Sequence, residues 1–333
     1  MKVVRHHTSA GPTLAVQLDE ETIADLPAGL DLAALVATDG LLHDAGDQAR
    51  RTGKRRPLAG AKLMAPLDPP TFRDFSTFPE HTAGSVKLLD PTAGIPAEFY
   101  EIPTFYFSNP YAITGPHDDI PVPPGCELFD YELEVAAVVG RTGHDLTVAE
   151  AEDHIAGYVI LNDFSARDVQ FHEMRLRLGP AKGKDTATAL GSVFVTADEL
   201  QPHRSGSSFD LQMQVRVNGE LLGSDRLDHM AWSFPALAAY ASRGTVIRPG
   251  DLLGSGTCQS GCLAELWGRH GRGHHPPLQP GDIVTTTVEG LGETRNRIVA
   301  GAKSHPIHPW TQEQSLSRDA LTRSLAVTEA VLP

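Results

Sequence analysis

The segment Asp130–Val139, DYELEVAAVV, limits the possible folds of this chain more than any other stretch. Its β-branched and apolar residues favour a buried β-strand, in which Tyr131 and Leu133 share one face because side chains alternate along a strand. Glu132 and Glu134 then point together to the opposite face. Two adjacent carboxylates are costly to desolvate unless positive charge neutralises them. Either the pair lies on a solvated edge strand, or it holds a hard divalent cation with oxygen ligands.

The composition fits a globular protein with a sizeable core, because 41% of the 333 residues are hydrophobic and 21% are charged. The 28 basic and 42 acidic residues give a formal charge of −14, which argues against a nucleic-acid partner. No apolar run approaches the ~20 residues that span a bilayer, and none of signal-peptide length follows the N-terminus. We therefore expect a cytoplasmic protein without a membrane partner. The odd number of cysteines and their spacing predict reduced thiols at Cys126, Cys258 and Cys262.

The distribution of strands, turns and prolines predicts two parts. Residues 1–65 are expected to form a small N-terminal domain, which ends where Pro66 and its neighbouring prolines interrupt regular structure. Residues 66–333 contain short strands and Pro/Gly turns but few long helices, and the Asn218-Gly219 pair indicates a hairpin. We therefore predict a mainly β, α+β fold with sheets that roll together.

Polar residues follow a second predicted strand. The apolar strand predicted over 157–161 ends at Asn162-Asp163, so Asp163 sits where a buried strand stops and a side chain can face a cavity rather than the core. On the helix predicted to follow, Arg167 and Gln170 are three residues apart and so share a face. A structural salt bridge between Arg167 and Asp168 is the alternative for this cation.

Three further motifs carry chemical groups. The segment Lys182–Thr186 contains a glycine that tolerates close approach, and one of its lysines is a candidate to stabilise an oxyanion, although a surface loop is the simpler interpretation. Asp74 and His81 are seven residues apart, but isolated histidines are usually structural or exposed. Glu265 lies in an apolar setting, where an acid needs a partner.

In this order, the motifs resemble the fumarylacetoacetate hydrolase (FAH) family over about residues 60–300. The resemblance rests on Asp74-Phe75 with His81, Asp130–Glu134, Asn162–Gln170 and Lys182–Thr186, with Gly256-Thr257 and Pro280-Gly281-Asp282 extending it. It implies an FAH-type mixed β-sandwich roll with a small N-terminal domain, and a homodimer.

The resemblance also implies residue roles. The ligands of a Mg²⁺ or Ca²⁺ ion, with Mn²⁺ as a third option, would be Asp74, Glu132, Glu134 and Asp163, with Thr186 lining the cation-binding loop. The catalytic residues would be His81, which activates water, its orienting partner Glu265, and the oxygen-contacting Arg167, Gln170 and Lys182. The substrate-binding positions would be Tyr106, Thr257 and Ser76, the last in place of a tyrosine of fumarylacetoacetase itself.

The resemblance therefore implies a metal-dependent hydrolase that cleaves a C–C bond of a 1,3-diketone-type acid from aromatic or amino-acid catabolism. The metal would polarise a carbonyl and stabilise an enolate leaving group. Decarboxylation, isomerisation or hydration of a 2-oxo acid is the alternative, because each also needs a stabilised enolate. Asp74 with His81 favours hydrolysis, since decarboxylation needs no base that activates water. A metal-binding dimer without activity is a rival of another class.

Overall fold

The acidic segment forms the buried strand β11 (Leu133–Val139) in the middle of a large sheet. The computed structural model describes residues 1–88 and 90–307, of which Met1–Ala302 form one compact unit. Strand β11 pairs with β13 (Ile155–Ala166) on one side and with β21 (Leu252–Gly254) on the other. All seven residues of β11 are buried, which excludes a solvated edge strand.

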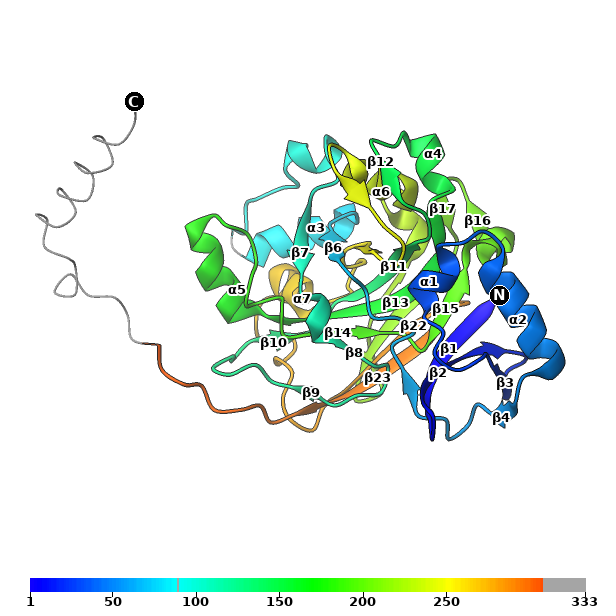
Figure 1. Cartoon of the computed structure of the whole chain (residues 1–333). Coiled ribbons are helices and arrows are strands. Elements are labelled where there is room, and N and C mark those ends of the chain that lie inside the picture. Colours follow the sequence, from blue (N-terminus) through cyan, green and yellow to red (C-terminus); the bar gives the residue numbers. More distant parts are fainter. Residues whose placement is uncertain (89, 308–333) are drawn as a thin grey trace, which may run out of the picture. The chain divides into compact units, whose positions relative to one another are not determined.

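The large sheet has the strand order β4-β3-β2-β1-β15-β13-β11-β21-β6-β7 (Figure 1). Its remaining strands along this order are β1 (Lys2–Thr8), β2 (Gly11–Gln17), β3 (Thr22–Asp25), β4 (Arg55–Pro57), β6 (Phe72–Phe75), β7 (Phe105–Ser108) and β15 (Val193–Thr196). Four short strands attach beside it: β5 (Leu63–Met64), β8 (Ile113–Thr114), β10 (Phe129–Asp130) and β14 (Ala187–Leu190). Strand β6 runs parallel to β21 and antiparallel to β7, so distant parts of the chain meet at this side of the sheet.

A second sheet has the order β19-β18-β22-β23-β9. Its strands are β9 (Ile120–Pro121), β18 (Gln212–Val217), β19 (Glu220–Arg226), β22 (Ile283–Val288) and β23 (Gly292–Val299). The predicted hairpin is confirmed between β18 and β19, where Asn218 and Gly219 have φ angles of 53° and 87°. Positive φ at both turn positions suits this residue pair. Two small ladders join β12 (Gly143–His144) to β20 (Val246–Ile247) and β16 (Arg204–Ser205) to β17 (Ser208–Phe209).

The helices are short. They are α1 (Leu32–Val36), α2 (Leu41–Thr52), α3 (Pro79–Ser85), α4 (Val148–Glu152), α5 (Arg167–Glu173), α6 (Phe234–Ser242) and α7 (Leu263–His270). Short 3₁₀ turns are η1 (Val86–Leu88), η2 (Ala97–Tyr100), η3 (Pro110–Ala112), η4 (Met174–Leu176), η5 (Ala197–His203) and η6 (Leu227–His229). Helix α3 packs on α7, and the Cys262 thiol caps the N-terminus of α7 by accepting the Glu265 N–H. This pair of helices carries two of the residues predicted to be catalytic.

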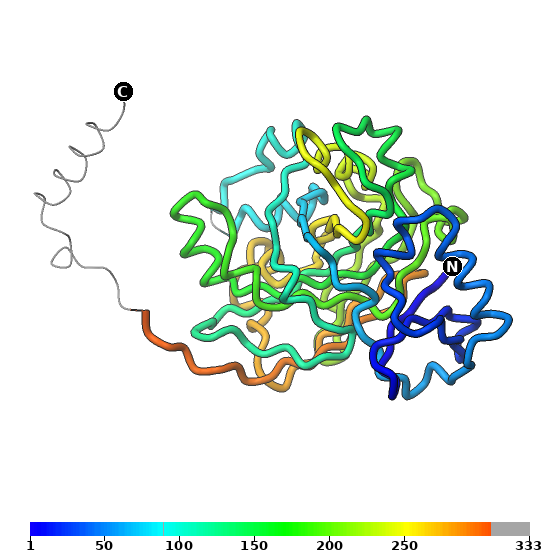
Figure 2. Tube along the Cα trace, in the orientation of Figure 1, coloured from blue at the N-terminus to red at the C-terminus, as the bar shows by residue number. Residues whose placement is uncertain are grey.

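Residues 1–65 extend the large sheet instead of closing a core of their own. Strand β1 pairs antiparallel with β15, with Val3 opposite Phe194, so the blue N-terminal segment runs beside the green middle of the chain in Figure 2. The side chains of Val3 and Leu14 share one hydrophobic cluster with Val138 of β11. The boundary predicted at residue 65 therefore crosses a continuous core. The prolines there interrupt regular structure along the chain, but they do not interrupt packing.

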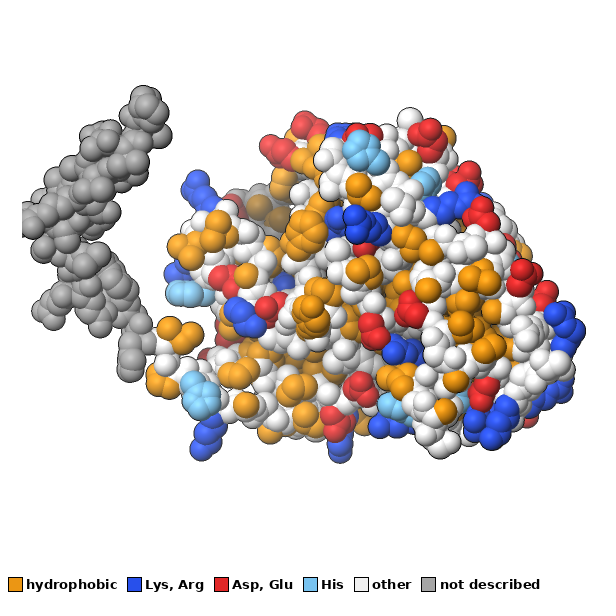
Figure 3. Space-filling model, viewed as in Figure 1, with side chains coloured by type: hydrophobic (Ala, Val, Ile, Leu, Met, Phe, Trp, Pro, Cys, Tyr) orange, Lys and Arg blue, Asp and Glu red, His pale blue; other side chains and the backbone are white. Residues whose placement is uncertain are grey.

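The surface of the described part carries charges of both signs. On the face in Figure 3, acidic and basic side chains are interspersed, with apolar side chains between them. The formal charge of −14 is therefore not collected in one patch on this face. Within residues 1–88 and 90–307, the structure contains no helix with the length and apolarity needed to cross a membrane.

Candidate functional site

Neighbouring strands bring the four predicted carboxylate ligands together. Asp74 lies on β6, Asp163 on β13 and Glu134 on β11, while Glu132 directly precedes β11. All four are at most 5% exposed. Gly254 of β21 leaves room between β6 and β11, because a Cβ there would lie 2.5 Å from Asp74 Oδ1 and 3.2 Å from Glu134 Oε2. Side-chain alternation thus puts Glu132 and Glu134 on one face, and the strand order brings Asp74 and Asp163 beside them. We call these four residues the carboxylate cluster.

Donors contact part of this cluster. The Tyr106 hydroxyl lies 2.7 Å from Asp74 Oδ2 and 2.6 Å from Asp163 Oδ2. Lys184 Nζ donates to Asp163 Oδ2 at 2.8 Å and also to Glu132 Oε2. Two carboxylate oxygens, Asp74 Oδ1 and Glu134 Oε1, are buried without a hydrogen-bond partner. Buried polar atoms without partners are rare, so these oxygens indicate the position of a missing positive charge.

The electrostatics of the cluster lead to the same conclusion. Burial and the nearby charge of Asp163 raise the pKa of Asp74 to about 7. Burial, together with the charges of Asp74 and Glu132, raises the pKa of Glu134 well above its usual range. Burial alone would also raise the pKa of Glu132, but the charges of Arg167 and Lys184 outweigh it and hold that pKa low. The cluster therefore carries more acid than its own cations neutralise.

The residues present fit a hard divalent cation. Asp74, Glu132 and Glu134 each offer an oxygen, and these three atoms lie within 4.8 Å of one another. Oxygen ligands of this kind suit Mg²⁺, Ca²⁺ and Mn²⁺. Thr186 was expected to line the cation-binding loop; its Oγ1 is buried without a partner, but the residue does not line the cavity beside the cluster.

Arg167 reaches the cluster through a buried anchor that sequence reasoning missed. Its Nη2 donates to Glu132 Oε1 at 2.6 Å and its Nε to Asp130 Oδ2 at 2.8 Å. Asp130 also accepts the N–H groups of Leu263 at 2.7 Å and Ala264 at 2.9 Å, at the start of α7. The alternative salt bridge of Arg167 with Asp168 does not form. Asp130 shares the two-residue period of Glu132 and Glu134, which was the signal available in the sequence.

The lysine in the cluster is Lys184, which corrects the assignment of Lys182. The Lys182 side chain is 70% exposed and its Nζ lies 2.5 Å from Asp185 Oδ1. A turn closed by the Lys184 N–H to Ala181 O, at 3.0 Å, turns Lys182 outward. Lys184 is only 3% exposed. Because only one glycine separates the two lysines, the sequence gives no reason to expect one rather than the other in the cluster. The turn determines which of them is buried.

His81 on α3 contacts Glu265 on α7, as predicted from the resemblance. His81 Nδ1 lies 3.1 Å from Glu265 Oε2, and Glu265 is fully buried. The carboxylate also accepts the Ser260 N–H at 2.7 Å and Arg269 Nε at 2.9 Å. Because a carboxylate accepts hydrogen bonds, Nδ1 carries the hydrogen and the lone pair stays on Nε2. Nε2 lies 3.2 Å from Ser85 Oγ.

A cavity of about 350 Å³ brings these groups into one space. Its polar lining includes Asp74, Ser76, His81, Ser85, Tyr106, Glu132, Glu134, Arg167, Gln170, Lys184 and Thr257. Its apolar lining includes Phe75, Val86, Leu88, Phe171, Met174 and Pro180. Four residues predicted from the sequence do not line the cavity: Asp163, Lys182, Thr186 and Glu265. Glu265 lies behind His81, and Asp163 lies behind Tyr106 and Lys184.

Comparison with known proteins gives matches over most of the chain. Residues 71–299 match the family described as "Fumarylacetoacetate (FAA) hydrolase C-terminal". Oxaloacetate tautomerase YisK of Bacillus subtilis (strain 168) is 32% identical over 247 residues, which are 72% of this chain and 74% of that protein. The chain spans 56–61% of the length of several other curated relatives.

Solved structures show the same architecture. A fumarylacetoacetate hydrolase from Exiguobacterium antarcticum is 27% identical with a TM-score of 0.71, over 90% of this chain and 99% of that one. The maleylpyruvate hydrolase from Sphingobium sp. SYK-6, in complex with manganese(II) and pyruvate, is 22% identical with a TM-score of 0.68, over 91% and 100%. These similarities confirm the predicted strand-dominated fold.

Proposed function

Because the chain belongs to the fumarylacetoacetate hydrolase family, we propose that it is a divalent-metal-dependent hydrolase that cleaves a C–C bond of a 1,3-diketone-type acid. One observation carries this proposal. The His81–Glu265 pair, joined at 3.1 Å, presents its imidazole to the same cavity as three carboxylates of the cluster. A base and a candidate cation site that share one cavity are what metal-assisted hydrolysis requires.

The carboxylate cluster would hold the cation, with the partnerless oxygens of Asp74 and Glu134 as its strongest support. A bound divalent cation supplies positive charge that polarises a carbonyl and favours an enolate leaving group. Arg167 and Lys184 are already fixed by Glu132, so their remaining N–H groups are preorganised to bind substrate oxygens. Arg167 Nη1 donates to Gln170 Oε1 at 3.1 Å, and the Gln170 amide lines the same cavity as Arg167.

His81 would act as the base. Its Nε2 lone pair accepts a proton from water. The Nδ1–H stays on the imidazole and keeps its hydrogen bond to Glu265, whose carboxylate stabilises the imidazolium that forms. Glu265 itself keeps the Ser260 and Arg269 donors, which hold its orientation through the reaction. General-base catalysis of this type typically contributes about 10²–10⁴-fold to the rate.

The cavity favours an apolar acyl group on the substrate. Val86, Leu88, Phe171, Met174 and Pro180 belong to its apolar lining, whereas the cations Arg167 and Lys184 lie at the carboxylate cluster. A diketo acid would place its carboxylate and carbonyl oxygens at the polar end and its acyl chain against the apolar lining. An acylpyruvate fits this distribution better than fumarylacetoacetate, which carries a second carboxylate at the far end.

The test is turnover of acylpyruvates of increasing chain length and of fumarylacetoacetate, with Mg²⁺ or Mn²⁺ added after chelation. His81→Ala should lower kcat by about 10²–10⁴-fold and leave cation binding intact. His117→Ala is the matched control, because His117 is exposed and lies outside the cavity lining. Equal background rates in wild type and His81→Ala on every diketo acid would overturn the hydrolase proposal.

Keto–enol tautomerisation of a 2-oxo acid is the second candidate, favoured by the 32% identity to the Bacillus subtilis oxaloacetate tautomerase. It needs a residue that moves a proton to and from carbon, a task that His81 can perform without a nucleophilic water. Following the decay of enol-oxaloacetate by absorbance would separate the two candidates. Faster catalysis of that decay than of any diketone cleavage would favour the tautomerase.

A further inference from the structure

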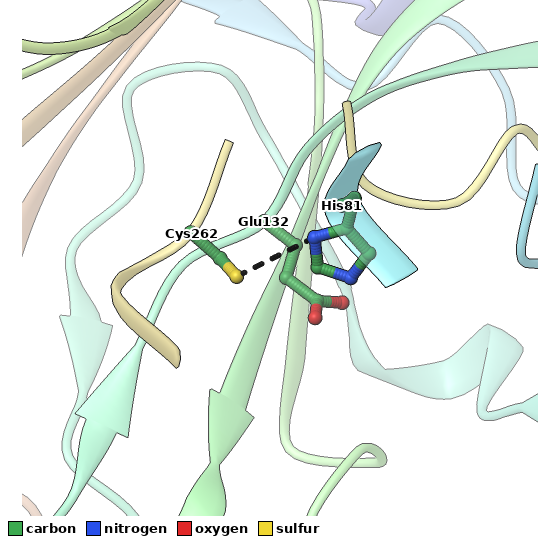
Figure 4. Close-up of side chains that lie close together, drawn as sticks. All are labelled: His81, Glu132 and Cys262. Carbon is green, nitrogen blue, oxygen red and sulfur yellow. Dashed lines mark hydrogen bonds between the residues drawn. The ribbon is translucent and has the colours of Figure 1, made fainter. Parts of the chain in front are cut away.

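A second group of metal-ligating side chains lies beside the carboxylate cluster: His81, Glu132 and Cys262. Figure 4 shows them converging from helix α3, from the residue before β11 and from the cap of α7. Each offers one ligand atom, and the three atoms lie within 4.8 Å of one another. Nitrogen, sulfur and oxygen form a different donor set from the oxygens of the carboxylate cluster. Thiolate and imidazole ligands select Zn²⁺ and similar ions over Mg²⁺.

The distances suit a small tetrahedral ion. Cys262 Sγ lies 3.9 Å from His81 Nδ1 (Figure 4). Zinc bond lengths to sulfur and nitrogen, at a tetrahedral angle, separate these two ligand atoms by about 3.6 Å. For the Cys262–His81 pair, a shift of a few tenths of an ångström is therefore sufficient. Glu132 supplies the third ligand, and the cavity that His81 and Glu132 line can supply water as the fourth.

Groups around the three ligands can support the bound state. The Glu265 N–H donates to Cys262 Sγ at 3.4 Å, and a metal-bound thiolate can keep that bond. When Nδ1 binds a metal, the imidazole hydrogen moves to Nε2, where Ser85 Oγ at 3.2 Å accepts it. Glu265 loses His81 but retains Ser260 and Arg269 as donors. Glu132 keeps Arg167 and Lys184 as donors and would bind the ion through a remaining carboxylate lone pair.

We propose that His81, Glu132 and Cys262 form a thiophilic metal site, and that Zn²⁺ bound there inhibits the enzyme. Binding replaces the thiol hydrogen by a metal–sulfur bond and releases one proton to solvent. With Nδ1 on the ion and hydrogen on Nε2, the imidazole no longer accepts a proton from water. Glu132 belongs to both donor sets, so the two ions compete for it. The inhibition rests on the proposed function, whereas the binding does not.

Binding is tested with Co²⁺ added to the metal-free full-length protein, because cobalt–thiolate bonds absorb in the near ultraviolet. The band should appear in wild type and in the control Cys126→Ser, whose thiol is only half-buried and contacts Asp168. It should disappear in Cys262→Ser, in which a hydroxyl can still cap α7. It should persist in Glu134→Gln, which removes a ligand of the carboxylate cluster only. A wild-type spectrum without the band, or a band that survives Cys262→Ser, overturns the site.

Inhibition is measured separately, by titrating Zn²⁺ into enzyme with excess Mg²⁺ and expressing each rate relative to the same variant without Zn²⁺. The concentration for half-inhibition should rise about tenfold or more in Cys262→Ser, because losing even a hydrogen-bond partner of a metal ligand typically costs about 10–100-fold in affinity. Equal inhibition of both proteins overturns the inhibitory role. If no diketo acid is cleaved while the cobalt band is present, the proposed function fails and the metal site stands.

Discussion

Lys184 Nζ lies 2.8 Å from Asp163 Oδ2, with 3% of the lysine residue and none of the aspartate exposed. The same ammonium group also donates to Glu132, so one cation serves two carboxylates. Arg167 is likewise divided between Glu132 and Asp130. Asp74 and Glu134 are left without a basic partner, which is why their oxygens remain available to a cation.

Lys184→Met should therefore be severely impaired. Removing the ammonium leaves the buried Asp163 without a basic partner and Glu132 with Arg167 alone. This costs about 3–5 kcal/mol of unfolding free energy, and the lost oxyanion donor lowers kcat by about 10²–10³-fold. Lys182→Met is the matched control, since that side chain is 70% exposed and its loss should change stability by less than about 0.5 kcal/mol. Urea unfolding and kcat measure both effects. Similar losses in the two variants would contradict the assignment of Lys184.

Glu134→Gln should abolish the stabilisation that a divalent cation gives the wild type. A ligand at 100 times its Kd stabilises the native state by about 2.7 kcal/mol, seen as a rise in Tm on adding Mg²⁺ or Mn²⁺ after chelation. In the metal-free state the variant should be the more stable protein, because one of two repelling acids is gone. Glu98→Gln, at an exposed position, should retain the full cation effect. A cation effect that persists in Glu134→Gln would argue against the carboxylate cluster as the site.

The metal-free protein should lose stability as pH rises through about 7. The pKa of Asp74 is raised to about 7 by burial and by Asp163, so the native state keeps a proton that the unfolded chain releases near pH 4. This contribution is fully present below the unfolded pKa, falls steadily between the two pKa values and is gone above the native pKa of about 7. Urea midpoints between about pH 5 and 8.5 measure it. Saturating Mg²⁺ and Asp74→Asn should each flatten the profile, and a metal-free midpoint that rises over this range would contradict the prediction.

Asp130→Asn should destabilise the protein although Asp130 does not line the cavity. The carboxylate joins Arg167 to the N–H groups of Leu263 and Ala264, so its loss leaves a buried guanidinium half-paired and costs about 3–5 kcal/mol. Asp39→Asn breaks an exposed pair with Arg141, 2.6 Å apart, and should cost less than about 1 kcal/mol. Chemical denaturation gives both values. Equal effects would show that Asp130 is not an anchor.

Much of the candidate site follows from local sequence patterns. The two-residue period of a strand fixes Glu132 and Glu134 on one face, and the buried strand β11 confirms it. Asp163 was expected where a buried strand stops, but β13 continues past it to Ala166, so Asp163 projects from within the strand and that expectation was wrong. The inference about Glu132 and Glu134 holds because the alternation of side chains is a property of a few consecutive residues. The resemblance to the fumarylacetoacetate hydrolase family then implied which acids and which histidine meet.

The turn at Ala181–Lys184 is local, but two lysines separated by one glycine do not show which of them becomes buried. Other features depended on contacts between residues far apart in the chain. The α3–α7 packing puts Cys262 beside His81, and the pairing of β1 with β15 merges the N-terminal segment into the core. No local pattern encodes these, because each depends on which surfaces exclude water together. The sequence by itself determined which groups face inward from their own strands, and the tertiary structure decided which of them share an ion pair or a hydrogen bond.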